Sequence, residues 1–169
     1  MKPSRAALAL FLLVPSSLLP LAGAQDNLGT PTAQPVEAVA HGSFTITFDP
    51  GVIDHPYSGR VYIAISKAGR PEPRQRMGDW FGGGQVFSLD VKDVAPGGSV
   101  TLGAEALAFP QAYSEVPAGD LFAQAVARVN PDSPSPGRGE GDLYSLPVNM
   151  TFKPGSAGSA VLAPPVTAA

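Results

Sequence analysis

The sequence predicts an all-β fold, an antiparallel, immunoglobulin-like β-sandwich of about seven strands with at most one short helical turn. Two observations carry this prediction. Apolar residues alternate with a period of two in several short segments, which places each set on one face of a pleated strand. Glycine and proline, 19 of each among 169 residues, separate these segments. Many short strands divided by such turns are typical of a sandwich.

The first 24 residues have the three parts of a secretory signal peptide. Lys2 and Arg5 supply a basic start, residues 6–14 form an apolar run, and Ala-Gly-Ala at 22–24 forms a small-residue cleavage site. We therefore expect cleavage before Gln25 and a secreted or periplasmic protein with no membrane span after cleavage. The alternative is an uncleaved anchor, which the short apolar run and two prolines disfavour.

Cysteine is absent, which excludes disulfides, a zinc–thiolate site, a cysteine nucleophile and a lipid-anchored lipoprotein. An exported domain without disulfides depends on its hydrophobic core, which fits a bacterial envelope or extracellular setting. The formal net charge is −3, and the first 24 residues hold two basic residues and no acidic one. Because Arg70, Arg74 and Arg76 stand beside Glu72 and Asp79, no basic patch results, and we expect no nucleic-acid partner.

Composition divides the rest of the chain into three parts. Residues 25–41 lack periodicity and contain two prolines, which predicts a flexible linker. Residues 42–153 form one β-sandwich domain of ordinary size. Residues 154–169 are rich in Pro, Gly, Ala and Ser, which predicts a disordered tail.

Period-two alternation marks five strands of the predicted sandwich. Each strand should have one face in the core and one in water. The sets expected to face the core are Phe44, Ile46 and Phe48; Val61, Ile63 and Ile65; Phe87, Leu89 and Val91; Val100 and Leu102; and Tyr144, Leu146, Val148, Met150 and Phe152.

Residues 121–130 are ambiguous, because the alanine-rich LFAQAVARVN fits a helix capped by Asp120 as well as a strand. We favour a strand, since that agrees with the neighbouring segments. Its two faces would carry Leu121 with the alanines and Phe122 with Val126. A short helical turn is expected around residues 109–115.

The search for catalytic and metal sites yields few candidates, and we expect neither catalytic residues nor a metal or cofactor. The G-x-S-x-G motif of serine hydrolases is absent, and His41 and His55 are expected to be solvated loop residues. Asp49 and Asp54 lie near His55 without the spacing of a calcium loop, and turn chemistry explains Asp49 better. The acids Glu140 and Asp142, in a glycine-rich loop, are expected to be solvated.

The aromatic pair Trp80-Phe81, followed by Gly82-Gly83-Gly84, has three interpretations. A lone tryptophan at the mouth of a strand usually closes a hydrophobic core, and the glycines allow the backbone to fold over the ring. The pair could instead form an interface with another domain, or a flat platform that stacks on sugar rings. Tyr62 projects opposite Ile63, so the outer face could supply a second aromatic.

The order of several short segments resembles the amino-terminal β-sandwich of certain secreted bacterial putative esterases. The similarity covers roughly residues 60–152 and includes a PEPR loop, a Trp-Phe pair and a Gln-Ala-Val strand. In order, the matching segments are residues 71–74, 80–81, 90–91, 96–97, 109–110 and 119–126. In that family the catalytic residues belong to an α/β-hydrolase domain that follows the sandwich, so none is carried over to this chain.

The resemblance implies an exported, non-catalytic accessory module, or a truncated relative, of an esterase-type hydrolase. Its partner would be a hydrolase domain, and the expected docking or core-closing residues are Trp80, Phe81, Arg74, Glu72 and Tyr62. The alternative is an independent module that binds carbohydrate or another envelope or extracellular polymer through Trp80. A small enzyme in its own right is disfavoured, because no nucleophile, base and orienting acid can be assembled.

Overall fold

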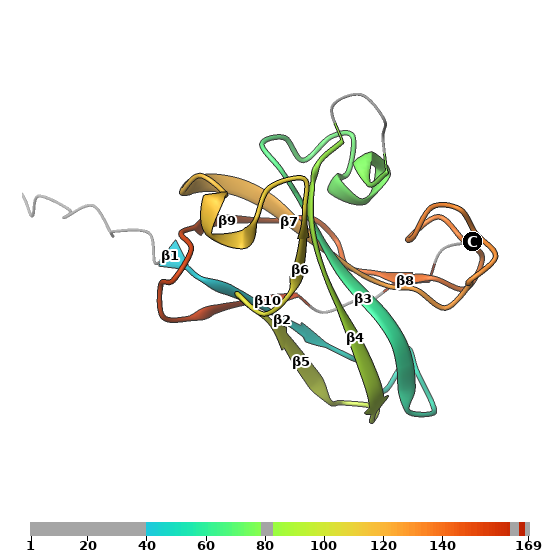
Figure 1. Cartoon of the computed structure of the whole chain (residues 1–169). Helices are drawn as coiled ribbons and strands as arrows, with labels where there is room; N and C mark the ends of the chain where they lie inside the picture. Colours follow the sequence, from blue (N-terminus) through green and yellow to red (C-terminus); the bar gives the residue numbers. More distant parts are fainter. Residues whose placement is uncertain (1–39, 79–82, 163–165, 168–169) are drawn as a thin grey trace, which may run out of the picture. The chain divides into compact units, whose positions relative to one another are not determined.

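Strands account for nearly all the regular structure of the described residues, as the sequence predicts (Figure 1). The structure, a computed structural model, describes residues 40–78, 83–162 and 166–167, which all lie in the unit formed by residues 37–169. The described residues contain eleven strands and two 3₁₀ turns, η1 (Pro73–Arg76) and η2 (Tyr113–Glu115). Among them, no helix has the length and apolar character needed to cross a membrane.

Two sheets of unequal size make up the fold. The larger sheet follows the order β1-β9-β7-β3-β4-β6, and β8 pairs with both β7 and β11. Its strands are β1 (Ala40–His41), β3 (Tyr57–Ser66), β4 (Gln85–Val94), β6 (Leu107–Phe109), β7 (Gly119–Ala127), β8 (Leu143–Tyr144), β9 (Val148–Phe152) and β11 (Val166–Thr167). The smaller sheet has the order β10-β2-β5 and consists of β2 (Ser43–Thr47), β5 (Ser99–Leu102) and β10 (Ser159–Leu162).

The sheets are mixed, so the prediction of a purely antiparallel sandwich is wrong in this respect. Strand β1 pairs parallel with β9, and β10 pairs parallel with β2, whereas the other pairs are antiparallel. Both parallel strands come from segments that we had expected to be a linker and a disordered tail. The pattern Ser-Ala-Val-Leu at 159–162 alternates by burial, but four residues in a Pro/Gly-rich stretch give a weak strand signal.

One hydrophobic core joins the two sheets. The Phe44 ring of β2 lies 5.6 Å from that of Phe87 on β4 and 5.4 Å from that of Phe152 on β9, measured between centroids. The predicted alternation of β2 and β3 is confirmed, since Phe44, Ile46, Val61, Ile63 and Ile65 are all buried in this core. Such aromatic contacts stabilise the fold in place of disulfides.

Strand β7 confirms the strand interpretation for residues 121–127, whereas residues 128–130 lie beyond the strand and Val129 is exposed. Its inward face carries Leu121 and three alanines, and the small alanines leave room for the aromatic rings of the smaller sheet. Its outer face is covered as well, since Gln124 and Val126 are fully buried. The predicted helical turn near residues 109–115 is confirmed as η2.

The predicted alternation over residues 144–152 is confirmed for Met150 and Phe152, which are buried in the core, and is wrong for Tyr144 and Leu146. Three residues between β8 and β9 lie opposite two residues of β7, which is the extra residue of a β-bulge. The Ala125 N–H donates to the Ser145 hydroxyl at 2.9 Å, so this side chain replaces a ladder bond. The extra residue shifts the alternation of side chains by one position, so Tyr144 and Met150 lie on opposite faces of the sheet. Tyr144 lies on the outer face, Met150 faces the core, and Leu146 is 61% exposed.

Candidate functional site

The PEPR loop is anchored to the outer face of the larger sheet through Gln124. The Arg74 N–H donates to Gln124 Oε1 at 3.0 Å, and Gln124 Nε2 donates to Glu72 Oε2 at 3.0 Å and to the Ser145 carbonyl at 2.7 Å. Arg74 Nε also donates to Glu72 Oε2 at 2.8 Å. Because a buried amide has to satisfy its polar atoms, this network determines where η1 sits on β7.

Arg74 also connects η1 to the loop at residues 128–142. Its Nη1 donates to the Gly137 carbonyl, and its guanidinium carbon lies 3.8 Å from the centroid of the Tyr144 ring. Glu72 and Arg74, two of the predicted docking residues, are therefore already bonded within the chain. A role for these two residues in binding a ligand or a second domain stays a prediction. What the structure shows is that they anchor η1 to the larger sheet.

Hydrogen bonding changes the pKa of Glu72. The Gln124 amide, and after it Arg74, hold the pKa of the Glu72 carboxyl below its usual value, against the opposing effect of burial. A carboxylate whose pKa is lower in the folded state stabilises the fold above the unfolded pKa, about 4.3 for glutamate. That contribution is lost as the pH falls through the folded-state pKa.

We expect E72Q to be less stable than the wild type at pH 7, with the difference shrinking as the pH falls below about 4. Urea unfolding at pH 7 and pH 3 measures this directly. The matched control is E140Q, which changes an exposed glutamate of the neighbouring loop. A difference between E72Q and wild type that is the same at both pH values would contradict the assignment.

Asp142 organises the loop at residues 128–142, which contradicts our expectation that it is solvated. Its side chain is fully buried, and four backbone N–H groups donate to its two carboxylate oxygens. The donors and distances are Val129 (2.7 Å) and Asn130 (2.9 Å) to Oδ1, and Gly137 (2.9 Å) and Gly139 (3.1 Å) to Oδ2. Hydrogen bonds from several backbone amides to one carboxylate hold distant parts of the loop together at a single point.

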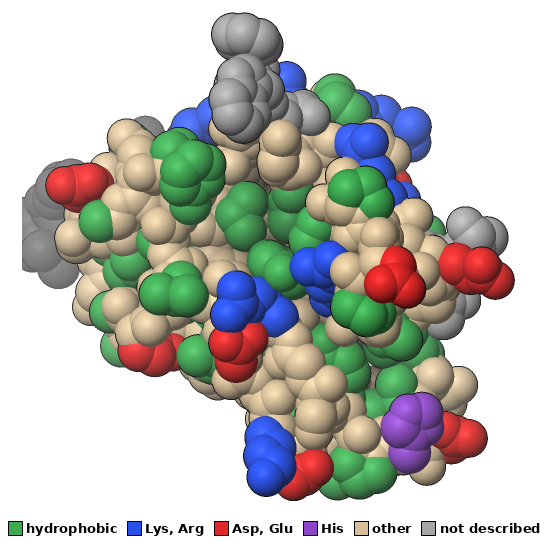
Figure 2. Space-filling view, turned by 45° about the vertical axis from the view of Figure 1, so that its right-hand side comes forward, with side chains coloured by type: hydrophobic (Ala, Val, Ile, Leu, Met, Phe, Trp, Pro, Cys, Tyr) green, Lys and Arg blue, Asp and Glu red, His purple; other side chains and the backbone are tan. Residues whose placement is uncertain are grey.

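Tyr62 lies on the outer face of β3, as the alternation predicts, and lines an apolar groove there. The groove has a volume of about 250 Å³. Met77 and Val86 form its floor, and Leu107 and Phe109 of β6 and Pro136 of the Asp142 loop flank it. Hydrophobic side chains gather around a hollow near the centre of the face drawn in Figure 2. We call this feature the outer-face groove.

The rim of the outer-face groove is unusually apolar. Leu107 is 65% exposed and Phe109 is 74% exposed. Both belong to β6, which ends the path of the larger sheet and, among the described strands, pairs with β4 alone. An edge strand with two large exposed apolar side chains is a surface suited to a partner. The sequence contained a signal for it, Leu-Ala-Phe with a period of two, which we had not interpreted.

The remaining predicted residues are not brought together. Trp80 and Phe81 lie outside the described residues, so their three interpretations stay predictions. Asp49 Oδ1 accepts the Gly51 N–H at 2.7 Å, which confirms the turn interpretation of this aspartate. His55 Nδ1 lies 2.5 Å from Asp54 Oδ1, and both side chains are exposed. Within the described residues, no group of three potential metal ligands occurs.

The prediction that His41 is a solvated loop residue is wrong. It is half-buried in β1, and its Nδ1 is buried with no hydrogen-bond partner among the described residues. Its backbone carbonyl accepts the Lys153 N–H at 3.0 Å and so continues the β1–β9 pairing. His41 therefore has a structural position at the edge of the larger sheet.

Comparisons with protein-family models, curated proteins and solved structures found no match for this chain. The resemblance to the sandwich of secreted esterases therefore stays a prediction from the residues that carry it. The described residues define an all-β fold whose larger sheet carries an apolar groove on its outer face.

Proposed function

We propose that this protein is an exported, non-catalytic β-sandwich module that docks to a hydrolase domain through the outer-face groove. Export is supported by the signal-peptide pattern of the first 24 residues. The hydrolase partner is supported by the similarity of residues 60–152 to esterase accessory domains. The docking surface is supported by the exposed apolar side chains of β6.

The single observation that carries the proposal is the pairing of an open edge strand with an apolar groove. Leu107 and Phe109 project from β6 beside a hollow whose floor is Met77 and Val86. Interface cores are enriched in aromatic residues and methionine, which fill well-packed pockets, and most charged residues are depleted there. Tyr62 adds an amphipathic side chain, which is common at interfaces.

The non-catalytic part of the proposal comes from the resemblance, which places the catalytic residues of that family in a separate α/β-hydrolase domain. Within the described residues, the only side-chain hydrogen bond of a histidine joins His55 to Asp54. Both of these side chains are exposed, whereas an activated nucleophile needs a base in hydrogen-bonding contact with it.

If the adjoining reading frame encodes a hydrolase domain, as the proposal requires, we expect the double variant L107S/F109S to bind that domain at least about tenfold more weakly than the wild type, since central aromatic anchors carry most of an interface's free energy. Isothermal titration calorimetry of the two purified proteins measures the effect. The side chains are exposed, so the substitutions should leave the fold intact, which circular dichroism checks.

The matched control is V161S, because Val161 is 64% exposed on β10 of the other sheet. This variant should bind like the wild type. Unchanged binding by L107S/F109S would remove the groove from the proposal. The absence of any hydrolase sequence in the adjoining reading frame would contradict the proposed hydrolase partner. Selective binding of an envelope polysaccharide would favour the alternative, an independent polymer-binding module.

A further inference from the structure

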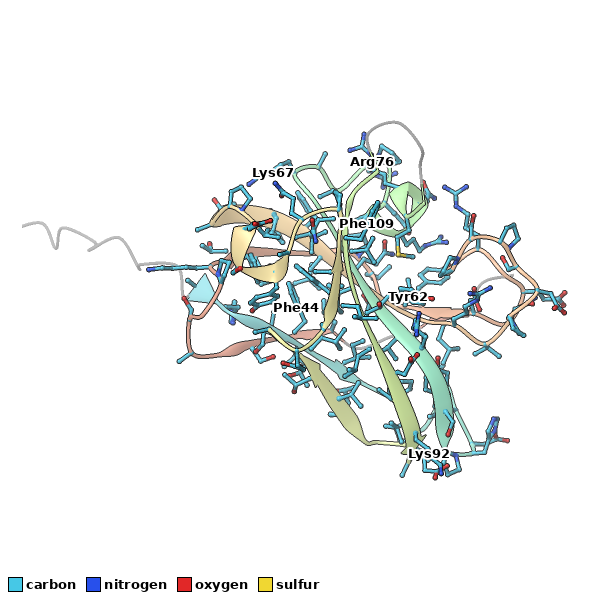
Figure 3. All side chains as sticks on the ribbon, in the orientation of Figure 1. Phe44, Tyr62, Lys67, Arg76, Lys92 and Phe109 are labelled. Atoms are coloured by element: carbon cyan, nitrogen blue, oxygen red, sulfur yellow. The ribbon has the colours of Figure 1, made fainter. Side chains whose placement is uncertain are left out.

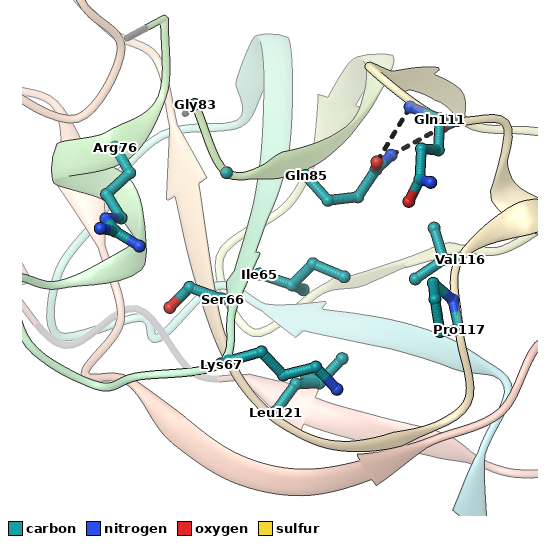
Figure 4. Close-up of a pocket in the computed structure, with 11 residues that line it drawn as sticks. Ile65, Ser66, Lys67, Arg76, Gly83, Gln85, Gln111, Val116, Pro117 and Leu121 are labelled. Carbon is teal, nitrogen blue, oxygen red and sulfur yellow. Dashed lines mark hydrogen bonds between the residues drawn. The ribbon is translucent and has the colours of Figure 1, made fainter. Parts of the chain in front are cut away.

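A second pocket lies at one end of the sandwich, where β3 ends and β4 begins. It has a volume of about 270 Å³. Arg76 of η1 faces it from one side, and Val116 and Pro117, which follow η2, face it from the opposite side (Figure 4). We call it the end pocket. It does not share a lining residue with the outer-face groove.

The floor of the end pocket is formed by the main hydrophobic core. Ile65, Val116 and Leu121 come from β3, the η2 segment and β7, and each is buried. All three belong to the core cluster that joins the two sheets. The pocket therefore opens onto the end of the core, and an apolar group that entered it would gain the free energy of hydrophobic burial.

The mouth of the end pocket is positively charged. Lys67 at the end of β3 and Arg76 of η1 both line it, and they lie at the end of the molecule opposite Lys92 (Figure 3). The three ion pairs among the described residues involve neither of them. Lys67 Nζ donates to the Asp120 carbonyl at 3.3 Å, which leaves further donors on its ammonium group.

The wall between the floor and the mouth is rigidly built. The Gln85 side chain accepts the Gln111 N–H at 3.0 Å and donates to the Gln111 carbonyl at 2.8 Å (Figure 4). This pair of bonds continues the β4–β6 pairing beyond the last strand residues. A wall held by two hydrogen bonds reduces the entropy lost when a ligand enters.

We propose that the end pocket binds a short aliphatic carboxylate. The apolar chain packs against Ile65, Val116 and Leu121, and the carboxylate accepts hydrogen bonds from Lys67 and Arg76. A guanidinium and an ammonium at the mouth of an apolar cavity complement an anion with an apolar tail, because charge-assisted bonds orient the head while burial stabilises the tail. This site is independent of the proposed docking function.

The test is isothermal titration calorimetry of the purified protein with hexanoate. Hexanol and hexylammonium, which share the six-carbon chain but not the negative charge, are the matched probes. We expect hexanoate to bind at least about tenfold more tightly than hexanol and hexylammonium to bind more weakly still. Affinity should fall with added salt, since the mouth contacts are electrostatic and partly exposed. Equal binding of hexanoate and hexanol would overturn the proposal.

Variants locate the site. K67Q and R76Q should each weaken hexanoate binding by about tenfold, whereas K92Q at the opposite end should leave it unchanged. The melting temperature of each variant checks that the fold persists, and the salt dependence in the wild type tests the charge requirement without any substitution. Equal weakening in K92Q would show non-specific attraction to surface cations and would overturn the assignment. L107S/F109S should retain full hexanoate affinity, so failure of the docking proposal and failure of this one are distinguishable.

Discussion

Replacing Asp142 by asparagine is expected to lower the free energy of unfolding by about 3 kcal/mol, a large share of the stability of a small domain. In the wild type, each of the two carboxylate oxygens accepts hydrogen bonds from two backbone N–H groups, four in total. An asparagine amide keeps one acceptor oxygen and turns an N–H₂ group toward two other donors. The two unpaired donors then lose their bonds inside a buried site, where the cost is highest.

Thermal unfolding of D142N, followed by circular dichroism, should show a midpoint roughly 10 °C below that of the wild type. Amide hydrogen exchange gives a more local readout, because the N–H groups of Val129, Asn130, Gly137 and Gly139 should lose protection first. The control is E140Q, which changes an exposed acid in the same loop and should stay within about 0.5 kcal/mol of the wild type. Wild-type stability in D142N would show that the four bonds do not hold the loop.

The same substitution connects stability with the outer-face groove. Pro136 lines the groove and lies in the loop that Asp142 holds, next to Gly137, whose N–H donates to the carboxylate. Arg138 adds a bond to the Gln75 carbonyl of η1. A buried carboxylate therefore determines the position of a groove wall to which it does not itself contribute.

Local patterns predicted the strands that have one dry face and one wet face. In β2, Phe44 and Ile46 enter the core, while Thr45 and Thr47 bond to hydroxyls of neighbouring strands on the outer surface. Period-two alternation encodes this arrangement in adjacent residues. The outward position of Tyr62 followed from the same rule, whereas the strand at residues 121–127 was inferred from its agreement with the neighbouring segments, because both of its faces are buried.

Features that depend on distant partners could not be predicted from local patterns. The burial of Asp142 requires the N–H groups of residues 129–139 to converge on one point, and no short-range pattern specifies that convergence. The bulge after Tyr144 depends on the Ser145 hydroxyl meeting the Ala125 N–H on another strand. Glu72 and Arg74 were recognised as a motif, but their bonds to Gln124 became visible only once β7 and η1 were placed together.

Strand β10 provides the second large effect, because it comes from the segment expected to be a disordered tail. Leu162 is fully buried in the core between the sheets, whereas its neighbour Val161 points to solvent. The register of β10 aligns Leu162 with Ile46 and Ala160 with Phe44 on β2. Residues 159–162 therefore contribute side chains to the core and do not form part of a disordered tail.

We expect L162A to lower the free energy of unfolding by about 3 kcal/mol, since it removes buried methyl groups and leaves a cavity beside Ile46. The matched control is V161A, which alters the adjacent residue of the same strand on its exposed face and should change stability by less than about 0.5 kcal/mol. Urea unfolding followed by circular dichroism measures both variants. The two substitutions lie next to each other on the same strand, and V161A removes a β-branched residue, so an effect of β propensity alone would be at least as large in V161A as in L162A. A large loss of stability in L162A but not in V161A therefore reports the burial of Leu162. Wild-type stability in L162A would contradict the packing of residues 159–162 against the core and would favour the predicted disordered tail.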